Sequence, residues 1–359
     1  MAHHNTVFSQ ILKLVPRHEF ETLAKAHHHG RAFRTASRWS QFVCLSMAQL
    51  TGRNSLRDMV ENISAQTHRL YHLGSAKLLK RCQGHVPGHQ FTFKNTLYSM
   101  DASTIDLCLN IFPWAKFKLT KSAIKLHVGL NHEGYLPEFV TITEGNVADI
   151  TEGRKFTFPK HSIIVIDRGY VDHLWYKRLT QKEIFFVTRL KVSAKYKVIE
   201  RHIIDKTKGV TSDQTIQFVS KDKPYKCPIP LRRVGYRDPK TGKHYSFLTN
   251  NFELSAKTVA DIYKSRWQVE LFFKWVKQNL KIKSFIGTSK NAVMTQIWVA
   301  LCMYLLLAYL KFQSKLRKSM QQMLRLLQLN LFEKRDLMAL LRGDPPIIKN
   351  TNIHQLGLI

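Results

Sequence analysis

Residues 162–167 read SIIVID, a short continuous apolar run that ends in an aspartate. A run of this length and composition is typical of a central strand that is buried on both faces of a sheet. An aspartate at the end of such a strand is poorly placed for a core, but well placed for a site at the carboxyl edge of the sheet. Asp167 is therefore a candidate functional residue, although strand-terminal aspartates often only cap helices or bind turns.

Further strand-like segments flank this run on both sides. Four of them lie between residues 97 and 190: LYSMDASTIDLCL (97–109), AIKLHVGL (123–130), YLPEFVTIT (135–143) and EIFFVTRL (183–190). The first carries Asp101, and the sequence NHEG at 131–134 is a strong hairpin-turn signal between the second and the third. Residues 191–250 continue in a β-like but polar pattern, with a turn at 238–242. The middle of the chain is therefore predicted to form a sheet.

The first 90 residues have helical spacing instead. Apolar side chains recur at helical intervals in three segments, 8–15, 39–50 and 56–63. Residues 51–55 break the pattern, and Ser55 is a suitable N-cap for the helix that follows. This arrangement is similar to a helix–turn–helix with Arg53 and Arg57 near the start of its second helix, which favours a DNA-binding unit. An ordinary helical bundle would give the same pattern, because such helix pairs also occur in proteins that never touch DNA.

A long helix is predicted from about Lys257 to Leu280. The helical wheel places four polar side chains along one narrow stripe: Tyr263, Arg266, Glu270 and Lys277. The opposite face is apolar and aromatic, and we expect it to be buried: Ile262, Val269, Leu271, Phe272, Trp275 and Val276. An exposed Arg266–Glu270 ion pair, which stabilises a helix by about 0.2–0.5 kcal/mol, would explain the charges on the stripe. It would not explain why a tyrosine joins them.

The chain is strongly basic. Its 359 residues include 56 Lys and Arg against 25 Asp and Glu, which gives a formal net charge of +31. The segment from Leu271 to Phe332 holds ten basic residues and no acidic one. Because phosphate neutralisation supplies most sequence-independent affinity for nucleic acid, a globular chain with this excess is predicted to bind DNA or RNA. A solubilising surface and attachment to a ribosome or a membrane surface are the alternatives.

The cysteines and the most apolar segment bear on where the protein works. The five cysteines are scattered and free of CxxC spacing, which is typical of reduced thiols in a cytosolic protein and not of a disulfide framework or a zinc site. The apolar segment 297–310 has 14 residues, fewer than the roughly 20 that span a bilayer. We expect it to be a buried core helix. A cytoplasmic protein without membrane attachment is therefore predicted.

Asp101, Asp167 and Glu270 together suggest a chemistry that none of them indicates alone. Three carboxylates can hold two divalent metal ions about 3.5–4 Å apart, an arrangement that activates a nucleophile and stabilises the leaving oxygen in phosphoryl displacement. Mg²⁺ suits a site made only of oxygen ligands and keeps water molecules for the reaction. The three residues are therefore candidate ligands for Mg²⁺.

The spacing of these residues resembles that of DDE transposases of the insertion sequence family four. Members of that family carry a Tyr-(2)-Arg-(3)-Glu-(6)-Lys signature, and YKSRWQVELFFKWVK at 263–277 fits every interval. YSMDAST resembles the family's first carboxylate region and places that role on Asp101, while IDRGY resembles the second and places it on Asp167. The two aspartates are separated by 65 residues, and Asp167 is separated from Glu270 by 102. The resemblance covers about residues 5–340.

The resemblance implies an α/β fold with a ribonuclease-H-like mixed-sheet catalytic core that a β-rich insertion interrupts. The interval between Asp167 and Glu270 has the length that such an insertion would produce. The implied domains are a helical DNA-binding domain (1–90), the first part of the catalytic core (91–190), the insertion (191–250), the second part of the core with the C-terminal helices (251–342) and a tail (343–359).

The resemblance also implies a mechanism. Mg²⁺ or Mn²⁺ held by Asp101, Asp167 and Glu270 would activate water to nick double-stranded DNA at the terminal inverted repeats. The freed 3′-hydroxyl would then attack a phosphate, first in excision and later in the target DNA. Arginine suits bidentate phosphate contacts and lysine a point charge, so the expected DNA-binding residues are Tyr263, Arg266, Lys277, Arg168, Lys274, Arg53 and Arg57. Relatives act as dimers on paired ends, so a homodimer assembled on DNA, in association with the bacterial nucleoid, is expected.

Two departures from the family pattern leave alternatives open. Some relatives flip a base onto a tryptophan of the insertion, whereas residues 191–250 contain no Trp, so that Tyr225, Tyr236 or Tyr245 would replace it. Between Gly74 and Phe91 the chain is shorter than the family pattern. A catalytically decayed transposase that only binds DNA is therefore the alternative function. A general nuclease of ribonuclease-H type is a third hypothesis, against which the basic N-terminal unit argues.

Overall fold

The computed structural model describes five stretches of the chain, residues 5–26, 37–52, 88–118, 120–219 and 229–346. The chain divides into two compact units. The first consists of Met1–His85, Asn279–Ile286 and Thr295–Ile359, and the second of Val86–Gln278 and Gly287–Met294. All described strands of the sheet belong to the second unit, which also contains the three candidate carboxylates.

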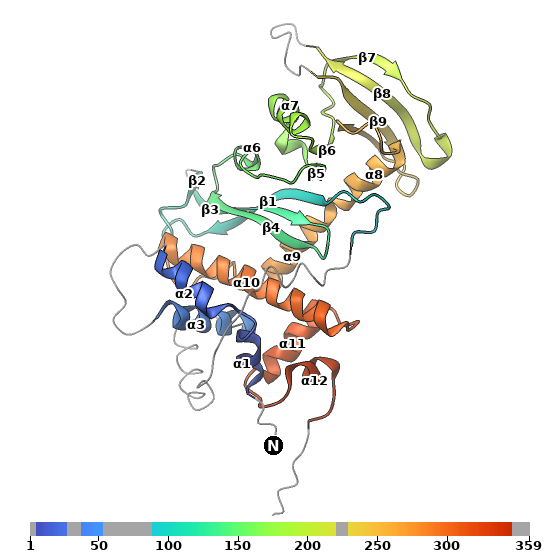
Figure 1. Cartoon of the computed structure of the whole chain (residues 1–359). Coiled ribbons are helices and arrows are strands. Elements are labelled where there is room, and N and C mark those ends of the chain that lie inside the picture. Colours follow the sequence, from blue (N-terminus) through green and yellow to red (C-terminus); the bar gives the residue numbers. More distant parts are fainter. Residues whose placement is uncertain (1–4, 27–36, 53–87, 119, 220–228, 347–359) are drawn as a thin grey trace, which may run out of the picture. The chain divides into compact units, whose positions relative to one another are not determined.

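The second unit is built on a mixed sheet (Figure 1). Its first five long strands are β1 (Leu97–Leu107), β3 (Lys121–Asn131), β4 (Leu136–Glu144), β5 (Ile163–Ile166) and β6 (Phe185–Arg189). They lie in the order β4-β3-β1-β5-β6, with antiparallel pairing on the β4 side of β1 and parallel pairing on the β6 side. The short strand β2 (Lys116–Lys118) pairs with β3. This is the ribonuclease-H-like mixed sheet that the resemblance implies, so the predicted fold class is confirmed.

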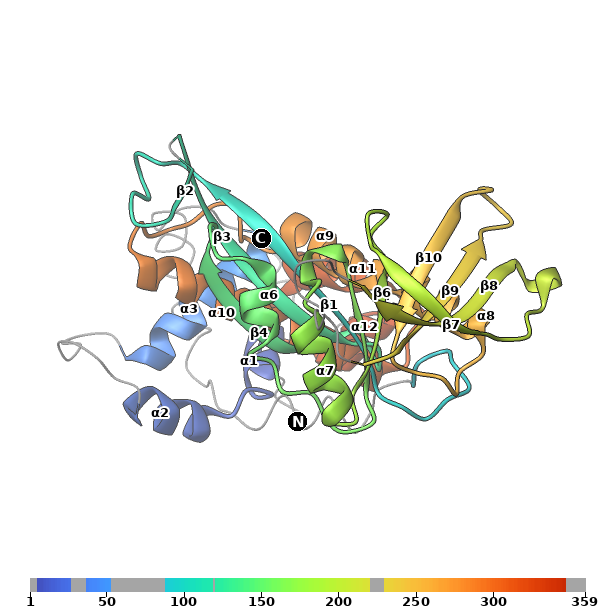
Figure 2. The same ribbon diagram turned by 90° about the horizontal axis from the view of Figure 1, so that it is seen from above.

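The polar β-like segment continues the same sheet. Its strands are β7 (Tyr196–Arg201), β8 (Val210–Phe218), β9 (Leu231–Arg237) and β10 (His244–Thr249), which follow β6 in the order β10-β9-β8-β7 (Figure 2). The predicted turn at 238–242 joins β9 to β10. The Asp238 side chain accepts hydrogen bonds from the backbone N–H groups of Lys240 and Thr241, and Gly242 adopts a φ of 68° that favours glycine.

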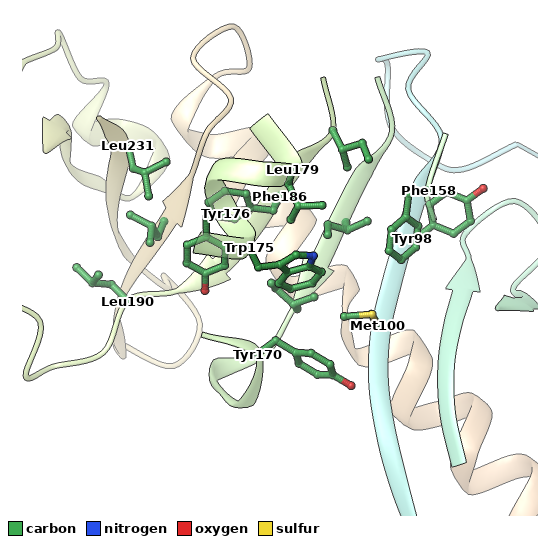
Figure 3. Close-up of a cluster of buried hydrophobic side chains, with 14 of the residues drawn as sticks. Tyr98, Met100, Phe158, Tyr170, Trp175, Tyr176, Leu179, Phe186, Leu190 and Leu231 are labelled. Carbon is green, nitrogen blue, oxygen red and sulfur yellow. The ribbon is translucent and has the colours of Figure 1, made fainter. Parts of the chain in front are cut away.

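Two apolar clusters cover the two faces of the sheet. The β5 sequence IIVI alternates between them, which explains why the run is continuously apolar. On one face, Ile164 and Ile166 pack with Tyr98, Met100 and side chains of α7 (His173–Gln181) (Figure 3). On the other face, Ile163 and Val165 pack with Leu97 and with side chains of α8 (Ala256–Ser265). Because side chains alternate along a strand, Asp101 lies on the α8 face and its neighbours Met100 and Ala102 on the α7 face.

The predicted long helix is interrupted, which corrects one expectation. It consists of α8 and α9 (Trp267–Asn279), which are separated at Arg266 and follow each other along the chain (Figure 1). The Arg266 N–H bonds to the Tyr263 carbonyl oxygen and the Val269 N–H to the Arg266 carbonyl oxygen, both three residues back. This tighter spacing shifts the wheel beyond Arg266. Leu271, which was predicted to be buried, is therefore 41% exposed, whereas Phe273 is buried.

The first unit is helical in the residues that the structure describes. Its helices are α1 (Val7–Leu12), α2 (Arg17–Ala26), α3 (Arg38–Thr51), most of α10 (Lys290–Ser314), α11 (Met320–Asn330) and α12 (Leu337–Arg342). Ser37 caps α3 and Gly52, with a φ of 71°, ends it. Arg53 and Arg57 lie outside the described residues, so the predicted helix pair stays a prediction. Within the described ranges, α10 is the helix that is long and apolar enough to cross a membrane, but 72% of its apolar window is buried, as expected of a core helix.

Candidate active site

Asp101 and Asp167 are brought to the same level of the sheet by the parallel pairing of β1 and β5. Met100 is the register partner of Ile166, and each aspartate is the next residue along its own strand. Asp101 is still within β1, where it pairs with Val128 of β3, whereas Asp167 directly follows the end of β5. The sheet register therefore places side by side two carboxylates that are 65 residues apart in the sequence.

The Asp101 carboxylate is engaged on both oxygens and largely buried. Its Oδ1 accepts a hydrogen bond from the Ala102 N–H at 2.8 Å, and its Oδ2 accepts one from Arg266 Nη1 at 2.7 Å. Its side chain is 18% exposed. Burial raises the pKa of Asp101 to about 6, the Arg266 charge opposes that rise, and the neighbouring Asp167 adds to it. A positive charge next to Asp101 is thus favoured at neutral pH.

Arg266 connects Asp101 to Glu270. Its Nη2 donates to Glu270 Oε1 at 2.5 Å, while its Nη1 holds Asp101 Oδ2. The Arg266 side chain is only 15% exposed, and Glu270, in the first turn of α9, is 34% exposed. The ion pair between Arg266 and Glu270 is present, but it is not the exposed, isolated pair that the helix pattern alone would explain, because Arg266 is largely buried and also binds Asp101. A single guanidinium links the first strand to the helix that carries the third carboxylate.

Asp167 has a capping role with one of its oxygens. It is the N-cap of the short 3-10 helix η2 (Arg168–Tyr170), and its Oδ1 accepts a hydrogen bond from the Gly169 N–H at 2.7 Å. Among the described residues, its Oδ2 accepts no hydrogen bond. A turn-binding role, which is common for strand-terminal aspartates, therefore explains only Oδ1 of Asp167. The Oδ2 atom is available as an acceptor.

The remaining signature residues lie in different environments. Tyr263 is half-buried, with its ring centroid 5.0 Å from that of Phe247, and burial raises its pKa. Lys277 Nζ donates to the Thr104 carbonyl oxygen of β1 at 2.6 Å. Lys274 is exposed. Arg168 is half-buried, and its Nε has no hydrogen-bond partner among the described residues.

The geometry and the chemistry of the three candidate carboxylates differ in how well they suit a divalent metal ion. In the described part of the chain, no three Asp, Glu, His or Cys side chains lie close enough together to hold one ion as they stand. The chemistry of the donors nevertheless fits, because Asp101, Asp167 and Glu270 offer only carboxylate oxygens, and Arg266 shows that a positive charge is accommodated between two of them. Metal binding by Asp101 and Glu270 requires that Arg266 release at least one of them.

The sequence analysis missed a polar group on the opposite face of β1 and β3. Asp149 is the first residue of α6 (Asp149–Gly153), and its Oδ1 accepts a hydrogen bond from Lys125 Nζ at 3.0 Å. His127 is buried, with its Nδ1 4.0 Å from the same oxygen. A signal for this group was present in the sequence, since Lys125 and His127 are two residues apart in an otherwise apolar strand and therefore share one face.

Comparison with protein families gives two matches. Residues 92–306, more than half of the chain, match the Transposase DDE domain. Residues 3–76 match a domain of unknown function. The first match includes all three candidate carboxylates and the whole of the signature segment 263–277.

Several curated proteins are similar to this chain. A protein named as a transposase, y4zB of Sinorhizobium fredii, is 35% identical over 65% of this chain and 66% of its own length. One named as a transposase for insertion sequence element IS5377, from Geobacillus stearothermophilus, is 33% identical over 62% of this chain and 59% of its own. One named for element IS4SA, from Synechocystis, is 27% identical over 59% and 60%. The matches thus span slightly less than two thirds of these relatives.

Among solved structures, a piggyBac transposase in a synaptic complex with hairpin DNA aligns with 97% of this chain and 84% of its own. The identity is 12% and the TM-score is 0.49.

Proposed function

This chain belongs to the Transposase DDE domain family, and we propose that it cuts DNA at the ends of an insertion sequence and joins the freed ends to a target. The observation that supports this function best is the cluster beside the end of β5, where β1 continues past it. There Asp101 and Asp167 occupy adjacent register positions, and Arg266 ties Asp101 to Glu270. Proteins of this family generally use divalent metal ions, and Mg²⁺, with Mn²⁺ as a substitute, is the ion that we propose here.

Asp101, Asp167 and Glu270 would hold the ion. When bound there, a divalent ion supplies an activated water and stabilises the leaving oxygen of a phosphodiester. The chain's own contribution is to keep three acidic groups deprotonated and correctly placed. Asp101 has to lose its proton, which the raised pKa of about 6 allows at neutral pH. Arg266 has to exchange a carboxylate for another anion.

A DNA phosphate is the anion that would draw Arg266 away from its carboxylates. Guanidinium donates to phosphate oxygens as readily as to carboxylate oxygens, so a phosphate can accept the hydrogen bonds that Arg266 gives to Asp101 and Glu270. Arg168 and Lys274 offer further cationic groups on η2 and α9. Lys277 would contact DNA after leaving the Thr104 carbonyl oxygen, and Tyr263 from its half-buried position. These roles, and those of Arg53 and Arg57 outside the described residues, are part of the proposal.

The proposed partner is double-stranded DNA carrying the terminal inverted repeats, bound by a homodimer. The five-domain division also stays a prediction. The candidates for the tyrosine of the insertion that receives a flipped base remain Tyr225, which lies outside the described residues, Tyr236 and Tyr245. Tyr236 and Tyr245 both pack partly against the apolar cluster on the α8 face. The Arg189 guanidinium lies over the Tyr245 ring at 5.0 Å, so a base could stack on this ring only after displacing Arg189.

A decayed, DNA-binding copy is not favoured by any observation. The sequence keeps all three carboxylates and every residue of the Tyr-Arg-Glu-Lys signature. The short segment between Gly74 and Phe91, which suggested decay, lies mostly outside the described residues.

The experiment that tests the proposed function is a nicking assay on supercoiled plasmid that carries the DNA flanking the gene. Wild-type protein with Mg²⁺ is expected to nick at the element ends, and Glu270→Gln to bind the same DNA without nicking it. The matched control is Glu253→Gln, which alters an exposed glutamate in the loop before α8 and should nick like wild type. Equal cleavage by Glu270→Gln would remove the catalytic assignment. Tight end binding with no cleavage by wild type in Mg²⁺ or Mn²⁺ would establish the decayed alternative, and equal cleavage of unrelated DNA a general nuclease.

A further inference from the structure

A fourth carboxylate lies beside Asp167, on the face of the sheet opposite to Arg266. Asp149 Oδ1 is held by Lys125 Nζ, which also donates to the Val147 carbonyl oxygen at 2.9 Å. Asp149 Oδ2 lies 3.8 Å from the position that a Cβ on Gly169 would occupy, and Asp167 Oδ1 lies 3.0 Å from the same position. Both carboxylates therefore lie close to Gly169, a residue that has no side chain. Lys125 holds one Asp149 oxygen, and the other oxygen lies near Gly169.

A buried hydroxyl points into the same region. Tyr170 is 1% exposed, and its hydroxyl has no hydrogen-bond partner among the described residues. Figure 3 shows the Tyr170 ring extending from η2 toward β1, with its hydroxyl next to the part of the strand that follows Met100. Burial raises the pKa of Tyr170, and the negative charges of Asp101, Asp149 and Asp167 raise it further. The hydroxyl therefore remains protonated, and among the described residues it is a donor without an acceptor.

The surrounding backbone is shaped to keep the Tyr170 ring in place. A Cβ on Gly153 of α6 would lie 3.0 Å from two ring carbons of Tyr170 and 2.8 Å from Met100 Cε, so a side chain there would force the ring or the methionine to shift. The ring is thus clamped between α6 and β1. A buried hydroxyl without a partner is destabilising, and a phenylalanine would fill the same space without that cost. Packing alone does not explain why the residue is tyrosine.

We propose that Asp149 and Tyr170 are positioning residues of the active site, which hold water ligands of the divalent ion that Asp101 and Asp167 bind. This inference rests on the proposed function. Mg²⁺ keeps several of its water molecules when it binds to carboxylates, and each such water has two hydrogens to donate. The Asp149 Oδ2 would accept a hydrogen bond from one of these waters, and the Tyr170 oxygen would accept one from a second, while the Tyr170 O–H keeps its proton and would donate a hydrogen bond to a carboxylate oxygen. If Asp149 served only to pair with Lys125, that role would involve Oδ1 and would give no function to Oδ2.

The test uses Mn²⁺ alone as the probe and the full-length chain. Mn²⁺ binding is followed by the loss of the free-ion electron paramagnetic resonance signal, for wild type, Tyr170→Phe, Asp149→Asn and two reference variants. Asp101→Asn removes a proposed direct ligand. Asp106→Asn is the matched control, because Asp106 is an exposed aspartate on the same strand, and it should bind like wild type. Residues that orient the ligands of a metal typically affect its affinity by about 10–100-fold, and we expect a loss of that size for both Tyr170→Phe and Asp149→Asn.

The outcomes separate this inference from the proposed function. If Asp101→Asn weakens Mn²⁺ binding while Tyr170→Phe and Asp149→Asn bind like wild type, the metal site stands and the positioning role is wrong. If wild type and Asp101→Asn bind Mn²⁺ equally, the proposed metal site itself fails, and the inference fails with it. Tyr170→Phe keeps the ring and removes only an unpartnered hydroxyl, so thermal melting without metal should show wild-type stability or better. A weakened affinity in a variant that melts normally supports the inference and excludes misfolding as its cause.

Discussion

Two buried arginines of the second unit, Arg232 and Arg266, are used in opposite ways. Arg232 of β9 donates two hydrogen bonds to one carboxylate, Asp213 of β8, at 2.9 and 2.6 Å. Its third nitrogen donates to the carbonyl oxygens of Leu254 and Asn251. Both side chains of this pair are less than a tenth exposed. Arg266 instead divides its hydrogen bonds between two carboxylates from different elements, one of which is a third exposed.

The difference shows how a fold separates a fixing contact from an exchangeable one. Arg232 and Asp213 are both buried, so neither side chain can move away from the other without leaving an unpaired buried charge. This pair therefore fastens β8 and β9 to the loop before α8. Arg266 holds one carboxylate with a raised pKa and one that reaches solvent, so either can be released at moderate cost. The open arrangement is the one that suits a site where a metal ion and a phosphate are exchanged.

A substitution at the Arg266 site should affect activity far more than stability. Asp101→Asn is expected to lower the rate of DNA cleavage by on the order of 10³-fold or more, because it removes a group that acts together with Asp167 and Glu270. Its melting temperature should stay close to that of wild type, since removal of the buried charge, which Asp167 also repels, offsets the lost attraction to Arg266. Cleavage rates and thermal melts measured on the same preparation check this. An inactive variant that is also unfolded would not fit, and neither would a folded variant that cleaves normally.

The second prediction separates the two sites by stability. Arg232→Met leaves Asp213 as an unpaired buried charge, so the free energy of unfolding should fall by about 3–5 kcal/mol. Arg266→Met should cost clearly less, on the order of 1–2 kcal/mol, because Asp101 can take up a proton and Glu270 reaches solvent. Urea unfolding of both variants at pH 7 measures the two losses. Equal losses would contradict the distinction between a fixing and an exchangeable arginine.

A buried histidine without an acidic partner, His132, should make the stability of the protein depend on pH. His132 is 3% exposed, and burial, with a smaller contribution from the charge of His89, lowers its pKa from 6.5 to about 4. The unfolded chain takes up a proton below about pH 6.5 and the folded chain does not. The stabilisation from neutral His132 is therefore fully present above pH 6.5 and is lost as the pH falls toward 4, by up to about 3 kcal/mol.

The His132→Gln variant isolates this contribution, because glutamine does not titrate. The stability of wild type relative to His132→Gln should decrease between pH 7 and pH 4.5, as measured by urea unfolding of both proteins. A difference that stays constant or grows as the pH falls would show that His132 is charged in the folded protein. The variant also alters the 2.6 Å contact between His132 Nε2 and the Ser99 hydroxyl.

The smallest expected effect concerns two lysines of α9. Lys274 is exposed, whereas Lys277 is held by the Thr104 carbonyl oxygen. Lys274→Gln should reduce the slope of log affinity against log salt concentration by about 1, with little change in cleavage of saturated DNA. Fluorescence anisotropy of labelled end DNA across a range of KCl concentrations measures the slope. An unchanged slope would place Lys274 outside the DNA interface.

Local patterns were sufficient to predict most of the core fold. The apolar run before Asp167 is a two-faced central strand, the 131–134 turn joins β3 to β4, and Asp238 forms the turn between β9 and β10. Each of these depends on a few neighbouring residues. The one-residue break at Arg266 was not predicted, because a wheel drawn at a constant 100° per residue has no means of detecting a single tighter turn.

Long-range partners were the part of the site that the sequence could not provide. Arg266 and Glu270 were placed together because they are four residues apart on a helix. The bond from Arg266 to Asp101 joins residues 165 positions apart, and no periodicity encodes it. Asp149 and the Arg232–Asp213 pair were missed for the same reason, since their roles arise only when β3, α6 and the extended sheet are assembled. The three carboxylates were identified as a set through the spacing of a family signature and not through any single motif.

If Asp101, Asp167 and Glu270 form one metal site, iron-directed cleavage of the protein should cut the chain at all three. Fe²⁺ is bound in place of Mg²⁺, and ascorbate with hydrogen peroxide then generates radicals that cut the polypeptide next to the bound ion. We expect cuts near residues 101, 167 and 270, which excess Mg²⁺ suppresses and Asp101→Asn weakens at all three places. Cuts at only one of these segments, or at segments elsewhere in the chain that Mg²⁺ does not suppress, would contradict a shared metal site.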